Sequence, residues 1–150
     1  MFLRSFFLVG RNALNITNFI KTIDYEKFGG FLSEIFTNQT IYIAAPTSQF
    51  SHLYELQKGA TSRILFGDSL EKYLKEKYRN CTILYDFYGE IFSLAEQRIC
   101  TEANYFVPWP KSTWSGMVNL NRLKLQKEEK KVHSFNDVHD IIAAYKKSIS

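Results

Sequence analysis

Short apolar runs alternate along the chain with longer segments whose apolar residues recur at helical spacing. The short runs are rich in β-branched and aromatic residues and are bounded by Pro, Gly, Asn or Asp, which is typical of strands. They predict five strands, at residues 2–9, 40–45, 63–66, 82–85 and 105–107. The longer segments predict helices between these strands and an amphipathic helix near the end of the chain.

A residue that can cap a helix precedes most of the amphipathic segments. The predicted caps are Thr22, Ser48, Ser69, Ser112 and Ser134, and Ser134 is followed by Asp137 in an arrangement that resembles a capping box. Helical spacing predicts a core-facing side for each helix. The residues expected on these sides include Phe28, Leu32, Leu53, Leu56, Tyr73, Leu74, Ile91, Leu94, Ile99, Val118, Ile141, Ile142 and Tyr145.

Strands that alternate with helices favour βαβ units and a parallel sheet. The fold class we expect is therefore α/β, a doubly wound and mainly parallel sheet of about five strands with helices on both faces, as in a Rossmann-like domain. We expect this domain to span residues 1–126. Residues 127–150 then form a charged linker and a C-terminal amphipathic helix that packs on the same domain.

Composition and charge exclude some classes of function. The chain is 45% hydrophobic and 23% charged, with a formal net charge of +4, which is ordinary for a globular domain. Its cations are not dense enough, and not interleaved with aromatic residues, to predict a nucleic-acid surface. No apolar run is long enough to predict a membrane span. Residues 1–10 are interpreted as a buried strand, not as a signal peptide.

The distribution of His, Cys and Asn residues bears on metals and on cell compartment. The three His are scattered and the two Cys lack ligand spacing, so we expect no metal site. Whether Cys81 and Cys100 pair stays open. Three Asn-x-Thr sequons, at Asn15, Asn38 and Asn80, give a weak indication of a lumenal protein, with chance occurrence as the alternative.

The candidate binding site is the segment Lys111-Ser112-Thr113-Trp114-Ser115, which follows a predicted strand and opens a predicted helix. Helix N-termini favour anions, because their amides and dipole face the ligand. The three hydroxyls can donate to phosphate oxygens, and the lysine adds positive charge. A helix cap without a ligand is the alternative. No Gly-rich dinucleotide or P-loop fingerprint is present.

Three further charged residues are candidates. Arg4 lies within an apolar strand, where it can clamp a diphosphate or, alternatively, reach water or an internal carboxylate. Asp68 and Asp86 end predicted strands, where they can accept hydrogen bonds from ribose or guanine. The alternative for each aspartate is a turn or a helix cap.

Several segments together resemble the C-terminal half of protein O-fucosyltransferases. They are Ala95-Glu96-Gln97-Arg98-Ile99-Cys100, then residues 103–107, then Ser112-Thr113-Trp114-Ser115 and Arg122. Upstream, residues 41–47 look like the strand of that family that ends in Ala-Thr-Asp, and Phe2-Leu3-Arg4 lies where the family has His-x-Arg. The resemblance runs discontinuously from about residue 2 to residue 122.

The resemblance implies half of a GT-B glycosyltransferase that binds GDP-fucose without a metal or other cofactor. It implies transfer of fucose to Ser or Thr of a protein acceptor in the endoplasmic reticulum or Golgi. Arg4 would match the catalytic arginine that stabilises the departing diphosphate. Ser112, Thr113 and Trp114 would match the loop around the phosphates.

The sequence also departs from the family pattern. Phe2 replaces the family's His, and Phe7 stands where an Asp is expected. The N-terminal, acceptor-binding half of the family has no counterpart in this sequence. We therefore expect the chain to be incomplete as an enzyme, because positioning of the acceptor contributes much of a transferase's rate. The alternative is a non-catalytic binding or interaction protein derived from a glycosyltransferase.

Overall fold

The computed structural model describes residues 5–8, 23–83, 87–125 and 135–150. The strands are β1 (Ser5–Leu8), β2 (Thr40–Ala44), β3 (Arg63–Phe66) and β4 (Tyr105–Val107). The helical elements are α2 (Tyr25–Ile35), the 3-10 turn η1 (Thr47–Gln49), α3 (Phe50–Gly59), α4 (Asp68–Lys77), α6 (Tyr88–Glu102), α7 (Thr113–Lys124) and α8 (Val138–Ser148).

The four strands form one sheet in the order β3-β2-β1-β4, and each neighbouring pair is parallel. Strand β2 is buried on both of its faces. Ile41 and Ile43 join the larger apolar cluster, whereas Tyr42 and Ala44 join the smaller one on the other side. This explains why residues 40–44 are almost continuously apolar, as is usual for a strand covered on both faces.

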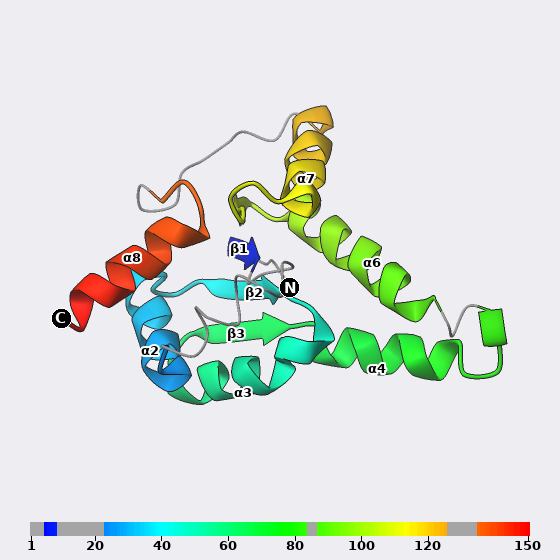
Figure 1. Ribbon diagram of the computed structural model, residues 1–150, viewed down its shortest axis with the longest axis horizontal. Coiled ribbons are helices and arrows are strands. Elements are labelled where there is room, and N and C mark those ends of the chain that lie inside the picture. The colour runs from blue at the N-terminus through cyan, green and yellow to red at the C-terminus, as the bar shows by residue number, and fades with distance from the viewer. Residues whose placement is uncertain (1–4, 9–22, 84–86, 126–134) are drawn as a thin grey trace.

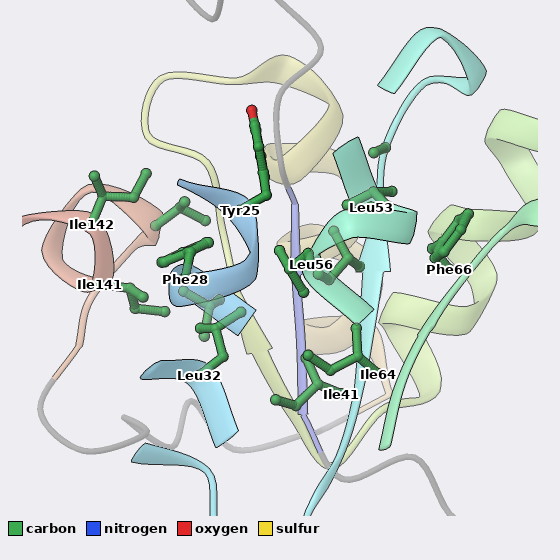
Figure 2. Close-up of a cluster of buried hydrophobic side chains, with 14 of the residues drawn as sticks. Tyr25, Phe28, Leu32, Ile41, Leu53, Leu56, Ile64, Phe66, Ile141 and Ile142 are labelled. Atoms are coloured by element: carbon green, nitrogen blue, oxygen red, sulfur yellow. The ribbon is translucent and has the colours of Figure 1, made fainter. Parts of the chain in front are cut away.

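The larger cluster packs α2, α3 and α8 against one face of the sheet (Figures 1 and 2). The C-terminal helix α8 contributes Val138, Ile141, Ile142 and Tyr145, all of them buried, as the spacing of these residues predicts. Its N-cap is Asp137, which accepts a hydrogen bond from the Asp140 amide. The smaller cluster joins α6 and α7 to the other face through Cys100, Trp114 and Val118.

Two glycines bring α2 and α3 into backbone contact. A Cβ atom at Gly29 would collide with the carbonyl oxygen of Leu56, and one at Gly59 would collide with the carbonyl of Glu26. On sequence grounds Gly29 is a weak helix former. In the structure, the missing side chain is what allows the two helices to approach each other this closely.

The prediction of a doubly wound, Rossmann-like sheet of about five strands is wrong. The sheet has four short strands, and helices make up most of the described chain. The strand predicted at residues 82–85 fails where it can be checked, because Thr82 and Ile83 are helical and Ile83 is 71% exposed. Short apolar runs do not distinguish a strand from a helical turn by periodicity alone.

Some predicted caps and faces are also wrong. The N-caps of α2, α3, α4 and α8 are Asp24, Gln49, Gly67 and Asp137, in place of Thr22, Ser48, Ser69 and Ser134. Thr22 and Ser134 lie outside the described residues. The side chains of Tyr73 and Leu94, predicted to be inward, are 57% and 65% exposed.

Replacing Gly29 with Ala should destabilise the fold by about 1–3 kcal/mol or more, because the new methyl group has no space against α3. Gly116→Ala is the matched control, since nothing lies within 4 Å of its added Cβ and alanine favours a helix. Urea unfolding measures both. Equal stabilities for the two variants would contradict the close approach of α2 and α3.

Candidate functional site

The loop between β4 and α7 ends in a capped helix N-terminus. The Ser112 hydroxyl oxygen accepts a hydrogen bond from the Ser115 amide at 3.3 Å, so the prediction that Ser112 caps this helix is confirmed. Lys111, just before the cap, has a φ of 59°, in the left-handed region that non-glycine residues rarely adopt. This turn presents the lysine and the start of α7 at the carboxyl edge of the sheet.

Two of the predicted binding residues hold the loop together from the inside. The buried Ser115 hydroxyl accepts a hydrogen bond from the Trp109 amide at 3.1 Å. The buried Trp114 indole donates to the Ser93 hydroxyl at 3.1 Å. These contacts point both side chains toward the interior, which leaves Lys111, Ser112 and Thr113 as the accessible groups of the predicted segment.

A pocket of about 460 Å³ opens beside this loop. Lys111, Ser112, Thr113 and Trp114 line it together with Gln97, Trp109 and Met117. The pocket combines one cation, two accessible hydroxyls, the amide of Gln97 and the aromatic surface of Trp109. Since the first amides of α7 point out of its N-terminus, the arrangement suits an anionic ligand that also carries a flat ring.

The other predicted site residues are not brought to this pocket. Asp68 opens α4 directly after β3, at the opposite edge of the sheet from β4. Three strand spacings, about 14 Å, separate those edges. The carboxylate of Asp68 accepts a hydrogen bond from the Tyr54 hydroxyl at 3.1 Å. Asp68 is therefore not among the residues that line the pocket beside the α7 loop.

Arg4 and Asp86 lie outside the described residues. The described part of β1 begins at Ser5, which pairs with Tyr105 at the amino end of β4. The α7 loop follows the carboxyl end of that strand. The predicted site residues that line the pocket are Lys111, Ser112, Thr113 and Trp114.

Sequence reasoning missed the structural role of Arg122. This buried residue donates hydrogen bonds to the carbonyls of Cys100, Thr101, Ala103 and Asn104, over distances of 2.6–3.2 Å. These carbonyls close the end of α6, where a helix leaves its last oxygens without intrahelical donors. The sequence does indicate that Arg122 is buried, because Arg122 follows the buried residues Trp114 and Val118 at four-residue steps on the same helix.

A second buried polar contact joins β2 of the sheet to α6. The Tyr42 hydroxyl donates to the carboxylate of Glu96 at 2.7 Å, and Glu96 is fully buried. Burial, reinforced by the Glu96 carboxylate, raises the pKa of Tyr42 far above its usual value. Burial likewise raises the pKa of the Cys100 thiol well above its ordinary value, so this cysteine stays protonated and is a poor nucleophile.

Comparisons with protein-family models, with curated proteins and with solved structures found no match to this chain. Within the described ranges, no group of three or more His, Cys, Asp or Glu residues is placed to hold a metal ion. None of the described helices is long and apolar enough to cross a membrane.

Arg122→Met should destabilise the protein by roughly 3 kcal/mol or more, because it leaves several buried carbonyls without their charged donor. Lys124→Met removes the same charge from an exposed position of the same helix and should change stability by less than about 0.5 kcal/mol. Denaturant titration compares the two. Similar small losses would show that the Arg122 contacts do not hold α6 to α7.

Proposed function

We propose that this chain binds GDP-fucose or GDP through the pocket at the start of α7. The observation that carries the proposal is the combination of Lys111, Ser112 and Thr113 with a helix N-terminus in one pocket of about 460 Å³. Phosphate groups are favoured at such a helix end, where the dipole, the amides and a lysine act together.

The same pocket offers groups for the rest of a nucleotide. The half-buried Trp109 provides a surface on which a base can stack. The Gln97 side-chain oxygen can accept a hydrogen bond from a base edge, while its nitrogen donates to the Trp114 carbonyl. The choice of guanine and of fucose comes from the sequence resemblance to protein O-fucosyltransferases. On this proposal, the chain supplies the donor-binding part of a fucosyltransferase-like protein that acts on Ser or Thr of a protein acceptor in the secretory pathway.

A non-catalytic binding role is favoured by the composition of the pocket. Its described lining holds no carboxylate or imidazole that could remove a proton from an acceptor hydroxyl. Without such a base, the described residues can bind a nucleotide sugar but offer no evident route to transfer. Incubation of GDP-fucose with the chain alone tests this second candidate, and we expect no release of GDP.

Binding is tested by the melting temperature with millimolar GDP, UDP and pyrophosphate. GDP should raise it, since a ligand that binds only the folded state stabilises that state, by about 2.7 kcal/mol at a concentration of 100 Kd. UDP and pyrophosphate should give smaller shifts. The absence of a shift with GDP would contradict the proposal, and an equal shift with pyrophosphate would contradict recognition of the base.

The double variant Lys111→Asn with Thr113→Ala should lose the GDP shift while keeping the wild-type fold. Both positions are exposed, and asparagine tolerates the left-handed backbone at position 111. Lys124→Asn is the matched control, because it removes an equal charge from the other end of α7 and should keep the full shift. Loss of the GDP-induced shift in this control would indicate that the net charge of the chain, and not the pocket, causes the shift.

A further inference from the structure

Helix α6 has an outer side that nothing covers within the described part of the chain. Its inner side packs Phe92, Glu96 and Cys100 against the sheet. Figure 1 shows α6 at the edge of the molecule, between α7 and α4. On the outer side, the side chain of Leu94 is 65% exposed at the centre of this helix of 15 residues.

Leu94 lies between two opposite charges on a row of residues four apart, and the row continues to Glu102 at the end of α6. Glu90 lies four residues before it and Arg98 four residues after it, and both are exposed. Residues four apart form a continuous ridge on a helix surface. Partly exposed Ile91 lies on one side of this ridge. Leu125, the C-cap of α7, is 51% exposed and borders a groove that Leu94 also lines.

The two charges that flank Leu94, on Glu90 and Arg98, are complementary across a two-fold axis. Helices that pack through their four-residue ridges lay these ridges alongside each other, the commonest class of helix packing in globular proteins. When a two-fold axis passes beside Leu94, the ridge of one copy runs opposite to the ridge of the other. Glu90 then meets Arg98 of the second copy, Arg98 meets Glu90 of that copy, and the two Leu94 side chains meet at the centre.

We propose that two copies of this chain associate through the outer side of α6, around Leu94. The charges that flank Leu94 favour a second copy over an unrelated partner, because a symmetric pair places Glu90 opposite Arg98 twice with one surface. Arg98 is available for this contact, since its partner within the chain, Glu102, forms with it an exposed i,i+4 pair of the kind that contributes little to stability.

Sedimentation velocity on the whole chain, from micromolar to near-millimolar concentration, tests the proposal. The wild-type chain should show a concentration-dependent dimer, and Leu94→Asp should lower its association constant at least tenfold. Leu123→Asp is the matched control, because Leu123 is 71% exposed on α7 but does not line the groove beside α6. This control should associate like the wild type.

Exchanging the charges of Glu90 and Arg98 tests how the two copies of α6 are aligned. Glu90→Arg alone and Arg98→Glu alone each place like charges opposite one another and should weaken association several-fold. A mixture of these two variants restores both opposite-charge pairs and should associate as strongly as the wild type. The proposal is overturned by a wild-type chain that stays monomeric, by Leu94→Asp associating normally, or by a mixture that associates no better than its components.

Discussion

The contact between Arg122 and the end of α6 fixes the half of the molecule that carries the proposed site. Four carbonyls in the last turn of α6 and the two residues after it accept hydrogen bonds from one guanidinium of α7. Because β4 begins directly after these carbonyls, the same contact sets the positions of α6, β4 and α7 together. The pocket at the start of α7 and the outer side of α6 both depend on this arrangement.

The other half is held by close packing. Gly29 and Gly59 let α2 and α3 approach at backbone distance, and α8 closes the apolar cluster over them. Among the described residues of this half, the buried polar residue is the uncharged Ser33, whereas the α6–α7 half contains the buried charged residues Glu96 and Arg122. The apolar half thus resembles an ordinary domain core, and the polar half orients the loop that we propose binds a ligand.

Much of the fold could be predicted from the sequence where apolar residues decide burial. Residues 63–66 and 105–107 form strands as predicted, and α8 buries the four residues that its spacing indicates. Prediction failed where a polar residue occupies the core. Glu96 takes the inward position of α6 through Tyr42, so Leu94 turns outward, against the prediction from apolar spacing.

The candidate site could be predicted only in part. The cap at Ser112 follows from residue type and position. The inward orientation of Ser115 and Trp114 could not be foreseen, because it depends on Trp109 and Ser93, residues that meet them only in the folded chain. Where Asp68 lies relative to the α7 loop could not be predicted, because this depends on strand order, and no local pattern in the sequence determines that order.

In the proposed complex, the first turn of α7 and the residues before it bind the phosphates of a nucleotide. The most direct test is a titration of the isotope-labelled chain with GDP, followed by amide and indole NMR signals. Binding at this site should give saturable chemical-shift changes for the amides of Lys111 and Thr113 and for the Trp109 indole. The amide signal of Asp68, at the far edge of the sheet, should stay unchanged. Shifts elsewhere, or none at saturating GDP, would contradict binding at this site.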